Sequence, residues 1–429
     1  MTTDHPDADM DHQRLVSWLR GRVATRLAAD PAGGQQPAQV EHLIETELDT
    51  YARAALRDGH PPLETATRAR VARAVRDGLL HLGGFQPYLD DPTVENITCN
   101  GADRVHVTYA DGQKVRVDPV CGSDQELVEL VRQVAARAGA EERRFDRGMP
   151  RLSVQLPDGS RLLAVMAVCA RPSVTIRRHR YLRVDLPQLR QLGSIDDRLE
   201  DLLSALVLAR RNLVISGGTN SGKTTLLRAL AGVIPAGERL VTIEDAFELA
   251  LERHRQDVVA LQAREPNVEG AGEVSMAELV RWALRMSPDR VIVGETRGPE
   301  VLTLCLAMSQ GNDGSLATVH ASSSRGALLR LATYAVQTPQ RLSLQAANLL
   351  VGGAVHVVVH LGRDPRGRRV VSSVREIVGV DDAQITTNEL FRPGPDRHAA
   401  VAVPPSQQLW EQLLAAGAPP GLFQPGGSR

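Results

Sequence analysis

The octet at residues 217–224, GGTNSGKT, constrains the fold of this chain more than any other feature. It fits the pattern G-x-x-x-x-G-K-[ST], in which backbone N–H groups cradle phosphates, the lysine reaches the β- and γ-phosphates and the hydroxyl binds Mg²⁺. An apolar run, Leu213–Ser216, precedes the octet, and a stretch of helix-forming composition, Thr225–Ala231, follows it. A strand, a glycine loop and a helix N-terminus in this order form an anion site, because the unpaired N–H groups and the helix dipole point at the ligand. The segment therefore predicts an α/β fold that binds a nucleoside triphosphate; the alternative is a tight turn without a ligand.

Lys223 is one of only two lysines among the 50 basic residues of the chain, the other being Lys114. A chain that uses arginine almost everywhere keeps a lysine where a compact ammonium must fit among phosphate oxygens. The planar guanidinium is a poor substitute for that point charge. We therefore expect Lys223 to bind phosphate. The predicted nucleotide-binding residues are Gly217, Gly218, Thr219, Asn220, Ser221, Gly222, Lys223, Thr224 and Thr225.

Composition excludes several other classes of protein. Aromatic residues make up 3% of the chain, which argues against stacking platforms for single-stranded nucleic acid. A net charge of −1 gives no global basic field toward DNA or anionic lipid. The four cysteines are scattered without a C-x-x-C pair, which suits a reducing compartment, and the longest apolar stretch, Leu162–Ala170, is too short for a membrane span. With an acidic N-terminus that lacks a signal-peptide core, the sequence predicts a cytoplasmic protein.

The 429 residues allow two to three domains, and the hydrophobic periodicity changes along the chain. Helical spacing comes first, after a disordered start over 1–12 and around a linker at 31–37. Alternating, strand-like segments with one helix follow. Helices and buried strands then alternate, which indicates a mostly parallel sheet with helices on both faces. The predicted parts are a helical region 1–84, an α+β domain 85–182, a linker 183–194 that carries Pro187 and Gly193, a P-loop domain 195–391, and a Pro/Gly-rich tail 392–429. We expect the tail to be mobile apart from a short helix near 405–415.

Three apolar, strand-like runs of the P-loop domain end in polar residues. Glu244 and Asp245 follow one run, Glu295 another and His320 a third. Ligand sites of α/β sheets form at the carboxyl ends of strands, and a Walker B acid belongs there beside Mg²⁺ and the attacking water. Each residue also has a purely structural interpretation. Glu244 or Asp245 could cap a helix, Glu295 could pair with an arginine, and His320 could be an ordinary hydrogen-bonded histidine.

Eight motifs in chain order resemble the secretion ATPases of the type II/IV superfamily, and within it the CpaF-like, tight-adherence (Tad) pilus-assembly branch. The likeness spans roughly 85–385. The motifs are 91–101, 156–161, 175–178, the P-loop 217–225, the "Asp box" 242–249, 266–270, the Walker B stretch 285–298 and the "His box" 314–321.

The resemblance implies a hexameric ATPase with a RecA-like domain, preceded by a small α+β (PAS-like) domain and an N-terminal helical segment. ATP and Mg²⁺ would lie between the two domains, where Arg177 and Arg178 of the first domain reach the nucleotide. An arginine that touches the γ-phosphate raises the hydrolysis rate by orders of magnitude. A solvated surface charge is the other interpretation of either arginine.

The same resemblance implies roles at the ends of the strands. Glu295 would polarise the attacking water and, with Thr224, serve Mg²⁺. Glu244 would be a second acid on the Mg²⁺ and γ-phosphate side, and His320 would sense the γ-phosphate. Gly294 stands where other P-loop enzymes have an acid, so Mg²⁺ contact through water is expected.

Two further positions depart from the pattern of the family. Ser287 stands where relatives often have an arginine, so hydrolysis could be slower, or Arg285 or Arg290 could substitute. Asn220 often corresponds to glycine and leaves the P-loop consensus intact.

The resemblance implies a motor that hydrolyses ATP and drives a polytopic inner-membrane platform protein to assemble or extrude pilin subunits. It would act as a homo-oligomer on the inner face of the cell membrane, without direct contact to nucleic acid. Two alternatives stay open. One is a conjugation or type IV secretion motor that exports DNA or protein, and the other is an ATP-dependent scaffold with little hydrolysis, favoured only by Ser287.

Overall fold

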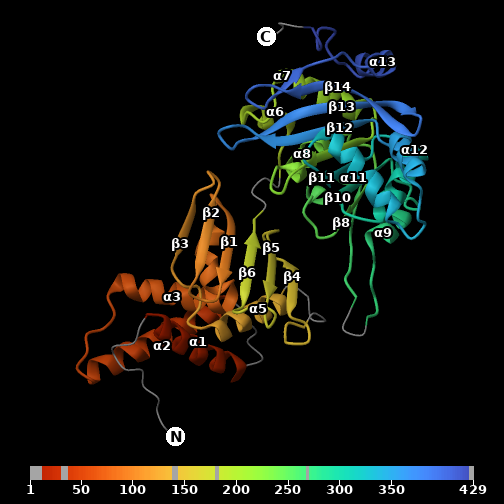
Figure 1. The fold of residues 1–429 in the computed structure, drawn as a ribbon. Coiled ribbons are helices and arrows are strands. Elements are labelled where there is room, and N and C mark those ends of the chain that lie inside the picture. Colours follow the sequence, from red (N-terminus) through yellow and green to blue (C-terminus); the bar gives the residue numbers. More distant parts are fainter. Residues whose placement is uncertain (1–11, 30–36, 138–143, 179–182, 267–269, 425–429) are drawn as a thin grey trace. The chain divides into compact units, whose positions relative to one another are not determined.

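The chain folds into two compact units, Met1–Arg180 and Tyr181–Arg429, each with its own hydrophobic core (Figure 1). The predicted disorder before His12, the predicted linker before Pro37 and the middle of the segment 266–270 lie outside the described residues. This computed structural model describes residues 12–29, 37–137, 144–178, 183–266 and 270–424.

Three helices open the first unit and pack into one hydrophobic cluster, because each carries apolar residues at helical spacing. Glu47 is fully buried in this small bundle. Its carboxylate forms ion pairs with Arg22 at 2.6 Å and with Arg26 at 2.7 Å, which offset the cost of burying the charge. The helices are α1 (His12–Ala29), α2 (Pro37–Arg57) and α3 (Thr65–Leu80).

A six-stranded antiparallel sheet with the order β3-β2-β1-β6-β5-β4 follows. Its strands alternate buried and more exposed residues, and the buried ones share a cluster with helix α5. This is the α+β fold that the sequence predicts, while its PAS-like character stays a prediction. The elements are η1 (Gly83–Phe85), α4 (Gln86–Asp90), β1 (Val94–Asn100), β2 (Val105–Tyr109), β3 (Lys114–Val117), α5 (Asp124–Arg137), β4 (Arg151–Gln155), β5 (Arg161–Val165) and β6 (Ser173–Arg177).

The described part of the second unit is built on a nine-stranded sheet with the order β15-β14-β13-β12-β7-β11-β10-β8-β9. The strands from β12 to β9 are parallel, and β13, β14 and β15 extend one edge antiparallel, which confirms a mostly parallel α/β sheet. The strands are β7 (Leu213–Gly217), β8 (Leu240–Glu244), β9 (Val258–Gln262), β10 (Arg290–Thr296), β11 (Leu316–His320), β12 (Val357–Arg363), β13 (Arg369–Asp381), β14 (Gln384–Pro393) and β15 (Ala399–Val401). The helical elements are α6 (Leu186–Gln191), α7 (Asp197–Leu208), α8 (Lys223–Val233), η2 (Leu251–Arg253), α9 (Met276–Ala283), α10 (Glu300–Ser309), α11 (Ser324–Val336), α12 (Leu344–Ala354) and α13 (Gln407–Ala415).

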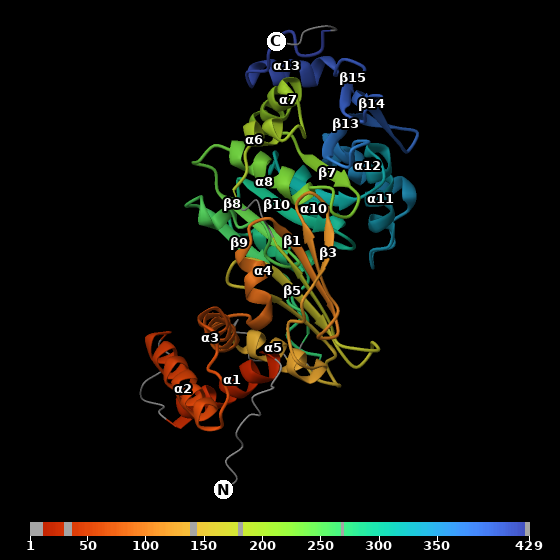
Figure 2. The ribbon, with the colours of Figure 1, turned by 90° about the vertical axis from the view of Figure 1, so that its left-hand side faces the viewer.

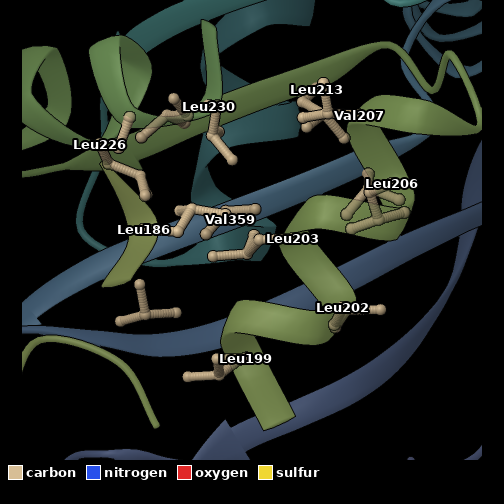
Figure 3. Packing of buried hydrophobic residues seen from close by; sticks show 14 of the residues in the cluster. Leu186, Leu199, Leu202, Leu203, Leu206, Val207, Leu213, Leu226, Leu230 and Val359 are labelled. Atoms are coloured by element: carbon tan, nitrogen blue, oxygen red, sulfur yellow. The ribbon is translucent and has the colours of Figure 1, made fainter. Parts of the chain in front are cut away.

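Helices cover both faces of this sheet (Figure 2). In β7, Leu213 and Ile215 point into a cluster with α6, α7 and α8, while Val214 points into a second cluster with α9 to α12. This alternation follows from the two-residue period of a strand. Figure 3 shows the first cluster, in which Leu199 and Leu203 of α7, four residues apart, belong to one packed face. Burial on both faces explains why the central strand β7 and its neighbours carry short continuous apolar runs.

The segment 183–194, predicted as a linker, contains helix α6. The side chain of Asp185 accepts the N–H of Gln188 at 2.8 Å, and the side chain of Gln188 accepts the N–H of Asp185 at 3.2 Å. This reciprocal capping box starts the helix, and Leu186 is buried. Pro187, one of the two residues on which the linker prediction rests, lies in the first helical turn, where an N–H has no helical partner to lose.

The predicted Pro/Gly-rich tail also differs from the structure. It contains β15, the predicted helix α13 and a segment that returns to the core, where Leu413 and Leu422 are buried. The ring of Phe423 lies 5.7 Å from that of Phe391 and 5.6 Å from that of Trp410. Apolar side chains separated by prolines and glycines lack helical or strand periodicity, so their packing could not be predicted from pattern.

Within the described ranges, no helix is both long enough and apolar enough to cross a bilayer. The same ranges contain no group of three or more His, Cys, Asp or Glu side chains placed to hold a metal ion. Mg²⁺ bound with a nucleotide needs no such group, because phosphates and water supply most of its ligands.

Candidate nucleotide site

The P-loop joins the buried strand β7 to helix α8, as the sequence predicts. Gly222 has a φ of 96°, which L side chains rarely adopt, and Asn220 shares the left-handed region at 56°. A Cβ atom on Gly217 would collide with Ser221 Oγ and with the carbonyl oxygen of Leu361. Gly222 precedes α8 without a side-chain cap, and Ser221 Oγ is buried without a hydrogen-bond partner among the described residues. N–H groups without a side-chain cap at a helix N-terminus fit a phosphate.

Lys223 is the first residue of α8 and is 8% exposed. Its ammonium donates to the carbonyl oxygens of Gly217 at 3.2 Å and of Gly218 at 2.9 Å, so it lies back across the loop. It also lies 3.4 Å from Nδ1 of His320, at the end of β11. β11 and β7 are neighbours in the sheet, and their register pairs His320 with Gly217. The predicted phosphate lysine and the predicted sensor histidine are thus brought together.

Glu295, near the end of β10, joins the same group of side chains. Its Oε1 lies 3.0 Å from His320 Nε2, and its Oε2 accepts a hydrogen bond from Arg297 Nη2 at 2.6 Å. Arg297 also pairs with Asp245 at 3.2 Å. Burial would raise the pKa of the Glu295 carboxyl, but the hydrogen bond from Arg297 and the nearby positive charges hold that pKa below its usual value. Glu295 is therefore ionised, and its pairing with an arginine, one of the two interpretations from sequence, is present.

Glu244 ends β8 and is 3% exposed. Its Oε2 accepts the backbone N–H groups of Glu248 at 2.8 Å and of Leu249 at 2.9 Å, so it orders the segment after the strand. Its Oε1 is buried and finds no hydrogen-bond partner in the part of the chain that the structure describes, and burial raises the pKa of this carboxyl to about 7. The next helical element, η2, starts only at Leu251, so helix capping by Glu244 or Asp245 is not what the structure contains. The role of Glu244 beside Mg²⁺ stays a prediction.

Sequence reasoning missed Glu248. Thr224 Oγ1, the predicted Mg²⁺ hydroxyl, donates to Glu248 Oε2 at 3.4 Å. The loop that carries Glu248 is held by Arg228 of α8, which is 4% exposed and donates to the carbonyl oxygens of Glu248 and Leu249. The only signal in the sequence is that Glu248 belongs to the same acidic segment as Glu244 and Asp245. Which of these carboxylates faces the P-loop depends on a turn that sequence pattern does not specify.

Arg177 and Arg178 belong to the first unit, at and just after the end of β6. Arg177 is exposed, whereas Arg178 is half-buried and donates through Nη1 to the carbonyl oxygen of Asp91. Their predicted reach to the nucleotide stays a prediction. Among the described residues of the first unit the two arginines differ, because the side chain of Arg178 makes a hydrogen bond that supports the local fold.

Ser287 lies shortly before β10 begins and has a φ of 51°. It is therefore at the amino ends of the parallel strands, whereas the P-loop follows the carboxyl end of β7. Arg290, suggested as a substitute for the missing arginine, is fully buried. Its guanidinium pairs with Glu238 at 2.7 Å and donates to the carbonyl oxygen of Val207 at 2.7 Å. Arg290 therefore cannot serve a phosphate on the P-loop of its own chain. It is a structural residue that joins β10 to α7.

A P-loop at the end of a central parallel strand, with an acid and a histidine at the ends of the neighbouring strands, defines a P-loop nucleotide-binding protein. Comparison with known proteins makes this more specific. The chain belongs to the type II/IV secretion system protein family, whose model matches residues 82–386.

Two relatives illustrate the family. A Mycobacterium tuberculosis protein named for conjugal transfer is 36% identical over 311 residues, which cover 70% of this chain and 86% of that protein. The type IV secretion system protein VirB11 of Brucella suis is 30% identical over 320 residues, or 68% of this chain and 88% of the relative. Among solved structures, the Brucella suis VirB11 ATPase in complex with sulphate is 30% identical, has a TM-score of 0.37, and is matched over 71% of this chain and 96% of that one.

Proposed function

We propose that this chain is an ATP-hydrolysing motor that powers a conjugation or type IV secretion system. The observation that carries the proposal is the continuous set of side chains from Lys223 through His320 to Glu295 at the carboxyl edge of the sheet. Membership of the type II/IV secretion system family supports it, as do the names of the relatives. The geometry fits a nucleotide because the loop presents backbone donors, a lysine and an unpartnered buried hydroxyl at one helix start.

In this proposal Lys223 exchanges the carbonyl oxygens of the loop for the β- and γ-phosphates of ATP. Thr224 and Glu295 are the proposed residues for Mg²⁺, and Glu248 lies close enough to Thr224 to contribute. A metal ion held there would supply positive charge to offset the negative charge that develops on the phosphate oxygens. Glu295 orients and polarises the attacking water through its carboxylate, which Arg297 keeps ionised. His320, between Lys223 and Glu295, links the phosphate side of the site to the water side.

The names of the relatives favour conjugation or type IV secretion over Tad pilus assembly, which the sequence motifs favoured. Sequence motifs placed Tad pilus assembly first and conjugation or type IV secretion second. The names of the relatives, conjugal transfer and type IV secretion, favour the second system. The Tad branch stays a candidate because of the motif set over 85–385. A strain that lacks the gene separates the two systems when both its transfer of DNA or protein and its assembly of pili are measured. Loss of transfer with normal pili supports this proposal.

The proposal includes an assembly. A homo-hexamer with ATP between its two domains, docked peripherally on an inner-membrane platform protein, is the arrangement that the family resemblance implies. Arg177 and Arg178 would then reach the nucleotide from the first unit. Cytoplasmic localisation belongs to the same proposal.

Steady-state ATP hydrolysis by size-fractionated protein tests the proposal, with Lys223→Ala and Glu295→Gln as variants. Hydrolysis in a hexamer-sized fraction that both variants lose by at least about a hundredfold supports a motor. A wild type that binds ATP but hydrolyses it no faster than Glu295→Gln, even with the platform protein present, leaves the scaffold as the better description.

A further inference from the structure

The hairpin formed by β12 and β13 lies beside the P-loop. β12 is the parallel neighbour of β7, and their register pairs Leu361 with Gly217. β12 continues for two residues beyond that pair, so its end reaches alongside the loop that follows β7. The chain then turns back, and the first residue of β13, Arg369, pairs with the last residue of β12, Arg363. The topology thus brings two arginines, far from the P-loop in sequence, to its side.

Both arginines bind Asn220 in the middle of the loop. The carbonyl oxygen of Asn220 accepts hydrogen bonds from Arg363 Nη2 and from Arg369 Nε, each at 3.1 Å. Arg369 Nη2 also donates to the side-chain oxygen of Asn220 at 3.0 Å. The Arg369 side chain passes so close to Gly222 that a Cβ atom there would lie 3.4 Å from Arg369 Cδ. One guanidinium therefore holds a backbone and a side-chain oxygen of the same P-loop residue.

This arrangement needs a physical reason, because like charges on directly opposite residues of a hairpin repel each other. The shared carbonyl oxygen of Asn220 offsets the repulsion by accepting from both cations. The hydrogen bonds also stabilise the backbone conformation of Asn220. Its φ of 56° is unfavourable for a residue with a Cβ atom, and asparagine adopts it mainly when its side chain finds a local partner.

We propose that Arg369 is a positioning residue of the nucleotide site, which holds the P-loop in its phosphate-binding shape through Asn220. The inference rests on the proposed function in one respect, namely that the P-loop binds the phosphates of a nucleotide. Arg363 assists from the opposite strand. Lysine cannot replace Arg369, because an ammonium cannot span the two oxygens as the rigid fork of a guanidinium does.

The expected kinetic signature is a change in affinity. The backbone of the P-loop binds the phosphates in the ground state and in the transition state alike, so a loosened loop weakens both. We expect Arg369→Ala to raise the KM for ATP and the dissociation constant for ADP by about tenfold, the size of one hydrogen bond to a charged group, with kcat changed less than about twofold. Loss of a merely structural residue would lower the folded fraction and leave the KM unchanged.

Arg366 provides a matched control, because it lies in the turn of the same hairpin with an exposed side chain. The experiment titrates full-length wild type, Arg369→Ala, Arg369→Lys and Arg366→Ala with a fluorescent ADP analogue and Mg²⁺, and records steady-state hydrolysis and thermal unfolding. A raised dissociation constant for both Arg369 variants, with Arg366→Ala like the wild type, supports the inference. If Arg369→Ala does not fold, Arg369→Lys decides the question alone. Wild-type affinity in a folded Arg369 variant overturns the inference.

A double-mutant cycle with Asn220→Gly identifies the contact. Glycine adopts a positive φ without strain and lacks the side-chain oxygen that Arg369 binds. In that background the shape of the P-loop, and with it nucleotide affinity, therefore depends less on Arg369. We expect the cost of Arg369→Ala to fall from about tenfold to less than about threefold. Equal costs in both backgrounds would contradict the role of Asn220. A wild type that binds no nucleotide would instead refute the proposed function itself.

Discussion

At the scale of single residues, Arg297 favours the ionised form of Glu295, the proposed catalytic acid. The hydrogen bond from Arg297 Nη2 to Glu295 Oε2, at 2.6 Å, lowers the pKa of a carboxyl that burial alone would raise. We predict that Arg297→Ala raises this pKa, so the acidic limb of the pH profile of kcat/KM moves to higher pH by about one unit. Hydrolysis at slightly acidic pH then falls, while hydrolysis at alkaline pH is largely retained.

Arg297→Lys is the matched variant, because it keeps a positive charge near Glu295. Its acidic limb should lie between those of the wild type and Arg297→Ala. An acidic limb that stays in place in Arg297→Ala, with activity lowered equally at every pH, would mean that Arg297 only supports the loop.

Glu244 makes stability depend on pH, because its buried carboxyl has a pKa raised to about 7. In the unfolded chain the same group titrates near its ordinary value of 4.5. Between these two values the folded protein binds a proton that the unfolded chain does not, so the free energy of unfolding falls as pH rises. Glutamine resembles the protonated acid and does not titrate. We therefore predict that the free energy of unfolding of Glu244→Gln, relative to that of the wild type, rises by about 3 kcal/mol between pH 4.5 and a pH above 7. Denaturant unfolding without nucleotide, followed across this range, measures the difference.

Glu252→Gln is the control for this experiment, since Glu252 is exposed in the same stretch of chain. Its unfolding curve should follow that of the wild type at each pH. Parallel curves for Glu244→Gln and the wild type would show that Glu244 is not held in its protonated form by burial.

At the scale of elements, helix α13 is part of the core of the second unit, in the same cluster as α7 and α8. Leu413 is fully buried, whereas its neighbour Leu414 is 39% exposed. We predict that Leu413→Ala lowers the free energy of unfolding by about 2–4 kcal/mol, because it leaves a cavity among packed residues. Leu414→Ala should cost less than about 1 kcal/mol. Denaturant unfolding monitored by the fluorescence of Trp410, in the same helix, compares the two variants. Equal and small losses would mean that the C-terminal segment contributes no stability.

Elements with local signals could be predicted from sequence, and elements that depend on distant partners could not. The strand, loop and helix around Lys223 were predicted because glycine positions and apolar runs are contiguous. Helix α6 was missed because Pro187 was interpreted without the capping pair around it. The contacts of Asn220 with Arg369 could not be foreseen, since they depend on β12 lying next to β7, a pairing across some 140 residues of chain.

At the scale of the whole molecule, sequence pattern predicted which strand ends meet but not which side chains face each other. Lys223, His320 and Glu295 lie at the ends of β7, β11 and β10, which are neighbours in the sheet, so their meeting follows from the α/β topology. Three residues of irregular chain separate Glu244 from Glu248, and only the structure shows that the former is buried and the latter lies near Thr224.

The two arginines at the end of β6 give the test that involves both units. The side chain of Arg178 donates to the carbonyl oxygen of Asp91 and so supports the first unit. The backbone N–H of Arg178 also donates to the carbonyl oxygen of Glu95 at 2.9 Å. Arg177 is exposed one residue earlier. We predict that Arg178→Ala lowers the stability of the first unit by about 1 kcal/mol. Arg177→Ala should leave stability unchanged and reduce the kcat for ATP by about a thousandfold, if this is the arginine that meets the γ-phosphate.

Arg116→Ala, which removes an exposed arginine from β3 of the same sheet, controls for loss of charge. Thermal unfolding, ADP affinity and steady-state hydrolysis of the three variants separate the two roles. ADP lacks the γ-phosphate, so its affinity should be unaffected in Arg177→Ala even where hydrolysis is lost. If Arg177→Ala hydrolyses ATP as fast as Arg116→Ala does, Arg177 is a surface charge. Arg178 would then be the remaining candidate of the two, and its loss would lower kcat beyond its effect on folding.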